Sequence, residues 1–194
     1  MIDADRQLFE WINGLAGESQ ALDNVMTLLV SDFFLPVLIA LAAFSRWFVG
    51  RTAQERLANQ WGFLYAAIGA GMANLIIQIF NQSFHRPRPF ITLEDVTVLF
   101  YRPTDPSFPS NAAAFGFAMA AGVWLTNRRW GAIIGVGALL FAFARIYAGM
   151  HFPLDVISGA LLGILTTWFF ARMLDQAKPV VDWAFRLLRW FHLA

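Results

Sequence analysis

The chain has 194 residues, of which 58% are hydrophobic and 16% aromatic, and its formal net charge is +1. The mean hydropathy of +0.55 exceeds what a soluble domain needs, so we expect membrane lipids around the chain and no nucleic-acid partner. The absence of cysteine excludes disulfides and thiolate metal sites. The composition therefore indicates an integral membrane protein.

The segment at 5–15 is amphipathic. Leu8, Phe9, Trp11 and Ile12 recur at helical spacing among charged residues, as in a helix that lies in the membrane interface. We interpret it as a capping helix without a chemical role. Acidic residues open the chain where a signal peptide would have basic ones, so we predict that no signal peptide is cleaved here.

Apolar segments long enough to cross a bilayer follow. A membrane helix needs roughly 20 residues to cross about 30 Å of hydrocarbon, and no residue between Arg56 and His85 is charged. The predicted spans are 25–48, 59–83, 110–127, 130–148 and 153–173. The segment at 179–193 is either an interfacial helix or a sixth span. We thus expect an all-α, polytopic bundle with five or six spans, forming a single domain over 1–194.

Glycines are paired at four-residue spacing in the last two predicted spans. The pairs are Gly131 with Gly135 and Gly159 with Gly163. Small residues at this spacing let membrane helices approach closely. We interpret both pairs as packing features.

Lysine and arginine are distributed unevenly between the two sides of the predicted bundle. If the spans alternate in direction, nine of these residues lie on the side of the 45–58 loop and five on the side of the proline-rich connection. The positive-inside rule places the first side in the cytoplasm. The connection after the second span and the turn at 148–153 then face outward, which in a bacterial inner membrane is the periplasm.

Three separate segments reach this outward side: Arg86 to Arg88, Pro109 to Asn111, and Arg145 to Asp155. Arginine is costly near lipid unless it is paired or hydrated, and its planar fork suits a phosphate. We therefore take Arg88 and Arg145 as phosphate-binding candidates. Ser110 precedes a predicted helix, whose N-terminus favours an anion, although a helix cap alone would explain this serine.

His151 and Asp155 are four residues apart where the last span begins. If Pro153 starts that helix, the carboxylate can accept a proton from one imidazole nitrogen and leave the other as a nucleophile or base. An isolated histidine at a helix start is usually a cap, but a carboxylate just inside a span is costly and usually functional. We therefore predict that both residues take part in catalysis.

The three segments resemble the motifs of the type 2 phosphatidic acid phosphatase family, written Lys-x6-Arg-Pro, Pro-Ser-Gly-His and Ser-Arg-x5-His-x3-Asp. In the third motif, Arg145, His151 and Asp155 match at the family's spacing, and Ala144 stands at the serine position.

The other two motifs are incomplete. The first ends in Arg88-Pro89, but Asn81 stands at the lysine position. The second begins Pro109-Ser110 and continues Asn111-Ala112 where the family has glycine and histidine. Together the three motifs cover residues 81–155.

The resemblance implies a small helical membrane phosphatase in which His151 attacks phosphorus, Asp155 supports it, and water hydrolyses the phosphohistidine. It implies no cofactor and no metal. The phosphate-binding positions that it implies are Arg88, Ser110, Asn111, Arg145 and Asn81.

In the family, the histidine at position 112 protonates the leaving oxygen, and Ala112 cannot do this. General acid catalysis contributes about 10²–10⁴-fold, so the chain should be slow. We interpret Ala112 as an engineered replacement of histidine, with a natural degenerate binding protein as the alternative. His85, beside Arg86, is a candidate substitute acid.

The predicted site lies at the bilayer boundary, which suits an amphiphilic lipid phosphate. The segments LFEWINGLAGESQALDNVM, HRPRPF and DPSFPSN resemble the bacterial undecaprenyl diphosphate phosphatases of the family. This implies a polyprenyl diphosphate substrate and a role in cell-wall peptidoglycan synthesis. Alternatives are phosphatidylglycerophosphate, lipid A or another phospholipid, and, in a different class, a non-catalytic binding protein or transporter. The oligomeric state stays open.

Overall fold

The computed structural model describes residues 3–179 and 182–183, and this part of the chain is all-helical. Nearly all of the predicted helix at 179–193 lies outside the described residues. The elements are α1 (Asp3–Asn13), α2 (Gln20–Val30), α3 (Phe34–Ser45), the 3₁₀ turn η1 (Arg46–Phe48), α4 (Ala53–Asn81), α5 (Pro89–Thr92), α6 (Asn111–Trp124), α7 (Arg128–Tyr147) and α8 (Pro153–Gln176).

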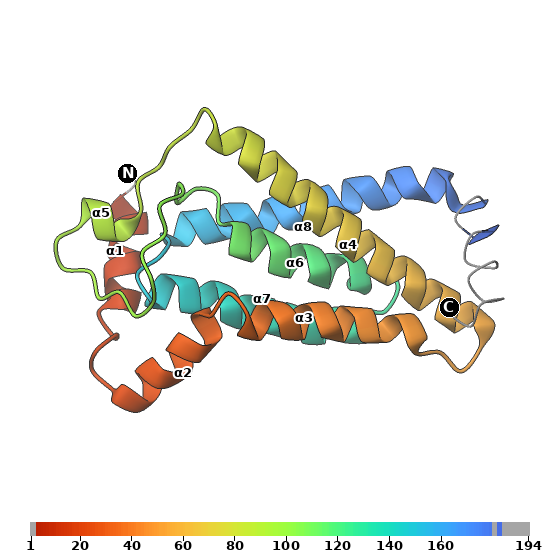
Figure 1. Cartoon of the computed structure of the whole chain (residues 1–194), viewed down its shortest axis with the longest axis horizontal. Coiled ribbons are helices and arrows are strands. Elements are labelled where there is room, and N and C mark those ends of the chain that lie inside the picture. Colours follow the sequence, from red (N-terminus) through yellow and green to blue (C-terminus); the bar gives the residue numbers. More distant parts are fainter. Residues whose placement is uncertain (1–2, 180–181, 184–194) are drawn as a thin grey trace.

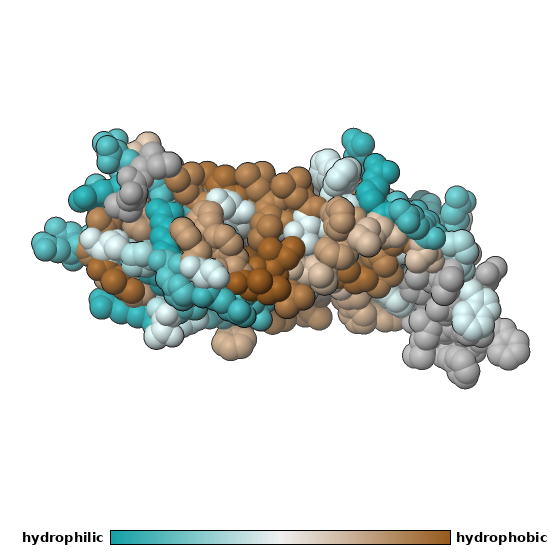
Figure 2. Space-filling view, turned by 90° about the horizontal axis from the view of Figure 1, so that it is seen from above, coloured by the Kyte–Doolittle hydropathy of each residue, from teal (hydrophilic) through white to brown (hydrophobic). Residues whose placement is uncertain are grey.

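The long apolar helices lie side by side along the long axis of the molecule (Figure 1). Among the described residues, α4, α7 and α8 are each long and apolar enough to cross a membrane. The predicted span at 25–48 is a bent pair, α2 with α3 and η1, which changes direction by 52° and counts as a fourth span if taken as one. Apolar residues cover the middle of the face shown in Figure 2, and hydrophilic residues gather toward both ends. The fold is the expected polytopic helix bundle.

Helix α6 is the central element, because α4, α7 and α8 all pack extensively against it. It has 14 residues, or about 21 Å at 1.5 Å per residue, and is shorter than a full membrane span. A Cβ atom added to Gly159 would lie 2.2 Å from the carbonyl oxygen of Ser110, and one added to Gly163 would lie 2.2 Å from that of Ala114. The predicted packing role of this glycine pair is confirmed, since only glycine lets α8 come so close to α6.

Helix α1 lies against the end of the bundle where α8 begins. Its buried face carries Phe9, whose ring centroid is 5.2 Å from that of Phe152. Asn13 at its end donates to the backbone carbonyls of Thr97 and Tyr147, each at 2.8 Å. Trp11 on the opposite face is exposed. This amphipathic helix therefore joins the long connection after α4 to the end of α7.

Candidate active site

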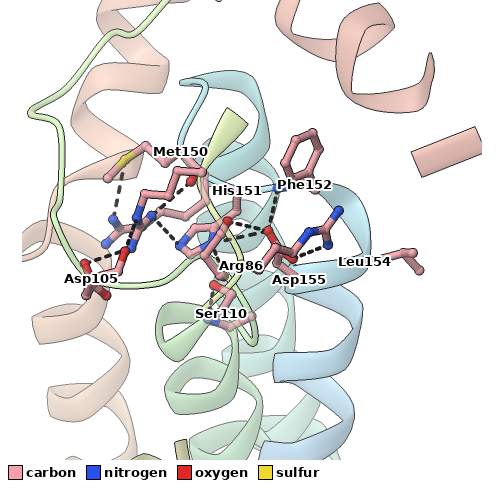
Figure 3. A network of polar contacts seen from close by, with 12 residues as sticks. Arg86, Asp105, Ser110, Met150, His151, Phe152, Leu154 and Asp155 are labelled. Carbon is pink, nitrogen blue, oxygen red and sulfur yellow. Dashed lines mark hydrogen bonds and ion pairs between the residues drawn. The ribbon is translucent and has the colours of Figure 1, made fainter. Parts of the chain in front are cut away.

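The three predicted segments meet at one end of the bundle. There the connection from 82 to 110, the start of α6 and the turn between α7 and α8 lie together, because α4 and α7 end where α6 and α8 begin (Figure 1). The convergence expected from the alternating spans is thus present. The network of polar contacts at this end is drawn in Figure 3.

A tight turn after α7 positions the histidine. Gly149 adopts φ +77°, a left-handed conformation that glycine adopts without steric cost. The amide of Met150 donates to the carbonyl of Arg145 at 3.0 Å, which closes the turn. Pro153 then begins α8, a position where its missing N–H costs nothing. The turn places His151 at the bundle end with its side chain directed inward (Figure 3).

His151 is buried, with 4% of its surface exposed. Its Nδ1 atom lies 2.9 Å from the carbonyl oxygen of Ser107. A carbonyl only accepts hydrogen bonds, so Nδ1 carries the hydrogen and Nε2 holds the lone pair. Nε2 lies 3.2 Å from Nη1 of Arg88. Backbone geometry therefore fixes the tautomer that a nucleophilic Nε2 requires.

The charge state of His151 follows from the same surroundings. Burial lowers its pKa, the nearby carboxylate of Asp155 opposes this, and the guanidinium of Arg88 lowers the pKa further. The net direction is downward, which keeps the imidazole neutral near neutral pH. A neutral imidazole can use its lone pair for attack on an electrophile.

Asp155 supports the histidine differently from the sequence expectation. Its Oδ2 atom lies 3.9 Å from Nδ1 of His151, beyond a direct hydrogen bond. Instead, the hydroxyl of Ser107 donates to Oδ2 at 2.5 Å and lies 3.4 Å from Nδ1, and the amide of Phe152 donates to Oδ2 at 2.9 Å. Ser107 thus links the carboxylate to the imidazole through both its carbonyl and its hydroxyl.

Arg86 balances the buried carboxylate. Its Nη1 contacts Oδ1 of Asp155 at 2.5 Å, its Nη2 contacts Asp5 of α1 at 2.6 Å, and its guanidinium stacks 4.4 Å from the centroid of the Phe152 ring. Asp5 also accepts from the amide of Leu154 at 2.8 Å. The pairing of Arg86 is therefore structural, and α1 has a part in it.

Arg88 is buried and held on three sides. Nε donates to the carbonyl of Asp105 and Nη2 to its carboxylate, both at 2.9 Å, while Nη1 donates to the carbonyl of Met150 at 2.9 Å. Burial lowers the pKa of Arg88 and Asp105 opposes the change. Arginine stays charged in proteins, so this guanidinium brings a fixed positive charge next to His151.

Arg145, near the end of α7, supplies the second positive charge. Its Nη2 is paired with Asp32, which also accepts from the hydroxyl of Tyr101 at 2.8 Å. The Nε–H of Arg145 is buried and has no hydrogen-bond partner among the described residues. A buried donor without a partner is costly, and an anion in the adjacent cavity would satisfy it.

A cavity of about 610 Å³ opens over His151, Arg88 and Arg145. Asn81, Asn111 and Ala112 also line it, so these predicted positions share one space. The remaining lining residues of the described chain are Asp32, Pro36, Asn74, Ile77, Gln78, Gln82, Tyr101, Pro103, Asp105, Pro106, Pro109, Phe115 and Phe141.

Four predicted site residues lie behind or beside this cavity. Ser110 is fully buried and caps α6, its hydroxyl accepting from the amide of Ala113 at 3.4 Å. Asp155 and Arg86 stand in the supporting network, and His85 is exposed and outside the described cavity lining. The sequence prediction missed Ser107, which sits within DPSFPSN two residues before the second motif and resembles an ordinary loop serine there.

These features define a multi-pass helical membrane protein with a buried histidine and two arginines lining one cavity at the end of the bundle. Residues 61–179 match the PAP2 superfamily, and the chain belongs to this superfamily. The chain is 30% identical over 182 residues to the undecaprenyl-diphosphatase BcrC of Bacillus subtilis, covering 93% of this chain and 90% of that protein.

Two crystal structures are similar in fold. Aquifex aeolicus LpxE has a TM-score of 0.63 and 32% identity, covering 84% of this chain and 92% of its own. The first transmembrane PAP2-type phosphatidylglycerolphosphate phosphatase from Bacillus subtilis has a TM-score of 0.59 and 25% identity, covering 90% and 87%. The family resemblance and the helical fold expected from the sequence are confirmed.

Proposed function

We propose that the chain is a lipid phosphate phosphatase that removes the terminal phosphate of a polyprenyl diphosphate, such as undecaprenyl diphosphate, through a phosphohistidine at His151. The observation that carries the proposal is the placement of Nε2 of His151, with its lone pair, 3.2 Å from the guanidinium of Arg88 in a cavity that Arg145 also lines. The similarity to an undecaprenyl-diphosphatase over most of both chains supports this choice of substrate.

In the proposed first step, Nε2 of His151 attacks the terminal phosphorus and the bond from phosphorus to the bridging oxygen breaks. The leaving lipid monophosphate takes the electron pair. Nδ1–H stays on the carbonyl of Ser107, and the positive charge that develops on the ring is balanced by Asp155 at 3.9 Å. Water then attacks the phosphohistidine, releases inorganic phosphate and restores the imidazole.

The phosphate oxygens would be held by Arg88 and Arg145, with the side chains of Asn81 and Asn111 and the N-terminus of α6 as further contacts. Phosphoryl transfer depends mainly on positioning and on stabilising charge. The two fixed guanidinium charges supply this without a metal, so we expect full activity in the presence of a chelator.

Ala112 lines the cavity, so a histidine at this position would share that space with His151. We propose that its absence leaves the leaving oxygen without an acid and makes this chain slow. The leaving group of a polyprenyl diphosphate is a lipid monophosphate, whose oxygen is weakly basic. The leaving group of a phosphomonoester such as phosphatidic acid is a strongly basic alkoxide. The loss should therefore be smaller for polyprenyl diphosphate than for phosphatidic acid.

The direct experiment measures phosphate release by the chain and by its Ala112→His variant, with polyprenyl diphosphate, phosphatidic acid, phosphatidylglycerophosphate and lipid A. We expect Ala112→His to raise the rate by about 10²–10⁴-fold, with the diphosphate as the best substrate. His151→Gln added to Ala112→His should abolish release. Equal rates for all four lipids would contradict the substrate assignment, and no release by either chain would contradict the enzymatic function.

A non-catalytic lipid phosphate binding protein is the second candidate, favoured by Ala112 and by Asn81 in the place of the family's lysine. Such a protein would bind a polyprenyl diphosphate yet release no phosphate even as Ala112→His. Calorimetric binding of the same lipid beside the release assay separates the two functions.

We further propose that the site faces the periplasm of a bacterial inner membrane, on the basis of the nine-to-five distribution of lysine and arginine. The chain has no cysteine, so Ser83→Cys, at an exposed position after α4, gives a single label site. A membrane-impermeant maleimide should label it in intact spheroplasts. Labelling only after lysis would contradict the proposed orientation and would place the site on the cytoplasmic side.

A further inference from the structure

A second polar cavity, of about 390 Å³, lies at the end of the bundle away from His151. At this end α3 and α6 stop and α4 and α7 begin (Figure 1). None of its described lining residues lines the cavity over His151, so the two cavities are separate. We call it the Arg46 cavity, and the members of its lining that matter below are Arg46, Arg51, Glu55, Ala58, Asn59 and Asn127.

Arg46 is the unusual member of this lining. It is buried, with 8% of its surface exposed, and its guanidinium carbon lies 4.8 Å from the centroid of the Trp130 ring. Its Nε–H is buried and has no hydrogen-bond partner among the described residues. In this part of the chain it forms no ion pair with a carboxylate. A buried cation without a counter-charge is costly, so this position calls for an anion.

The same pattern marks the phosphate cavity at the other end of the bundle. There the Nε–H of Arg145 is also buried without a partner. However, Arg145 is paired with Asp32, whereas Arg46 has no such carboxylate in the described chain. The need for an external anion is therefore greater at Arg46 than at Arg145.

The other polar groups of the lining also favour an anion. Asn127 caps α7 by accepting from the amide of Trp130 at 3.2 Å through its Oδ1, so its Nδ2 remains as a donor. The N-terminus of α7 carries a partial positive charge. Arg51 adds an exposed cation. Glu55 is the one acid of the described lining, and its carboxylate accepts from the amide of Arg51 at 2.9 Å.

Large apolar side chains are exposed next to this cavity. Phe48 and Val49 follow Arg46, and Trp124 and Leu125 precede Asn127, and all four are exposed. Apolar side chains at the ends of membrane helices face lipid, and tryptophan is enriched at the membrane interface. The Arg46 cavity therefore lies near the level of the phospholipid head groups.

We propose that the Arg46 cavity binds a phosphate group, as a free anion or as part of a phospholipid head. The guanidinium of Arg46 has the planar donor geometry that matches phosphate oxygens, and Asn127 with the start of α7 supplies further donors. The bound phosphate supplies the counter-charge that Arg46 lacks. This binding site is distinct from the catalytic one and does not depend on the proposed function.

Ala58 gives a local probe of occupancy. The chain has no cysteine, so Ala58→Cys places a single thiol in the lining. In detergent micelles, the rate of alkylation by N-ethylmaleimide is measured against increasing inorganic phosphate, with sodium chloride of equal ionic strength as the reference. We expect phosphate to slow the alkylation, because it fills the space beside the thiol. Ser83→Cys, outside both described linings, should react at an unchanged rate.

Two substitutions in the Ala58→Cys background remove the binding in different ways. Asn127→Asp keeps the helix cap, since aspartate caps as well as asparagine, but brings a carboxylate into the cavity. It should fold and raise the phosphate concentration for half-protection about 10–100-fold, the loss expected for a hydrogen bond to a charged group. Arg46→Met, which keeps an unbranched apolar stem against Trp130, should have the same effect, and Arg46→Lys should retain part of the protection.

The matched control is Arg129→Gln. It removes an exposed cation from the same end of the bundle, outside the described lining of the Arg46 cavity. Salt screens exposed charges, so the phosphate concentration for half-protection should hardly change. A loss equal to that of Arg46→Met would overturn the proposal, because the general charge of this surface would then attract the anion.

Lipids in the same micelles identify the source of the phosphate group. Protection by phosphatidylglycerol at a lower concentration than inorganic phosphate would identify a phospholipid head, and the reverse order would identify a soluble phosphate. Equal protection by phosphatidylcholine would overturn the proposal, because any lipid would then cover the thiol. The proposal also fails if neither phosphate nor phosphatidylglycerol protects, if chloride protects as well as phosphate, or if Asn127→Asp leaves the protection intact.

Discussion

Nη1 of Arg88 lies 3.2 Å from Nε2 of His151, while the carbonyl of Ser107 lies 2.9 Å from the opposite ring nitrogen. The imidazole is thus held between a backbone acceptor and a fixed cation. The acceptor sets the tautomer, and the cation disfavours protonation of Nε2. In the proposed reaction the same guanidinium holds a phosphate oxygen beside the attacking nitrogen, so it serves both the nucleophile and the electrophile.

Arg88→Lys tests this double role in the Ala112→His background. A single ammonium cannot reproduce the three contacts that Arg88 makes to Asp105 and Met150 while also facing His151. We expect kcat to fall by about 10²–10³-fold, the usual loss for one transition-state donor. Arg102→Lys, at an exposed arginine in the same connection, is the control. A loss similar to that of the control would contradict the role of Arg88.

Ser107→Ala tests the link between Asp155 and His151. It removes the hydroxyl that donates to Asp155 at 2.5 Å but keeps the backbone carbonyl that orients the imidazole. A buried hydrogen bond to a charged group contributes about 1.5–3 kcal/mol, so thermal unfolding should show a loss of that size. In the Ala112→His background kcat should fall while KM stays nearly constant. An unchanged unfolding temperature would argue against the bond.

The lowered pKa of His151 predicts how stability depends on pH. The unfolded chain binds a proton at this residue below about pH 6.5, whereas the folded chain resists protonation until a lower pH. The resulting stabilisation is fully present above about pH 6.5 and is lost as the pH falls toward the lower folded-state pKa. His151→Gln removes this contribution. Unfolding temperatures in detergent between pH 8 and pH 4 should therefore fall less steeply for the variant; parallel curves would contradict the shift.

Gly159→Ala tests the contact between α8 and α6 that supports the start of α6. The added Cβ would lie 2.2 Å from the carbonyl of Ser110, so α6 must shift, at a cost of about 1–3 kcal/mol. Phosphate release by Ala112→His should fall as well, since α6 carries the residues that line the cavity. Gly135→Ala, where the added atom has room, should be neutral. Equal effects of the two substitutions would contradict the packing argument.

The helices could be predicted because local patterns determine them. The uncharged stretch between Arg56 and His85 became α4, and the apolar run before Arg128 became α6. The break that divides α2 from α3 was missed, although Ser31 and Asp32 between the two apolar runs and Pro36 in the first turn of α3 mark it in the sequence. Hydropathy averages over such a short interruption.

The sequence predicted the site residues that lie within the three motifs, but not the residues that hold them in place. Arg88, Arg145 and His151 could be placed together because alternating spans bring their segments to one membrane side. The partners that hold them come from distant elements: Asp5 from α1, Asp32 from the bend after α2, and Ser107 from the long connection. Their pairing depends on tertiary packing, which no local spacing encodes. Asp5 in particular had the pattern of an ordinary acidic helix start.

The most direct test of the account is to trap the covalent intermediate during turnover. The Ala112→His variant would be mixed with polyprenyl diphosphate labelled with ³²P in its terminal phosphate, quenched in alkali, digested and mapped. We predict an acid-labile, alkali-stable label on the peptide that contains His151, absent in the double variant with His151→Gln. Phosphate release without a label on this peptide, or release that survives His151→Gln, would contradict His151 as the nucleophile.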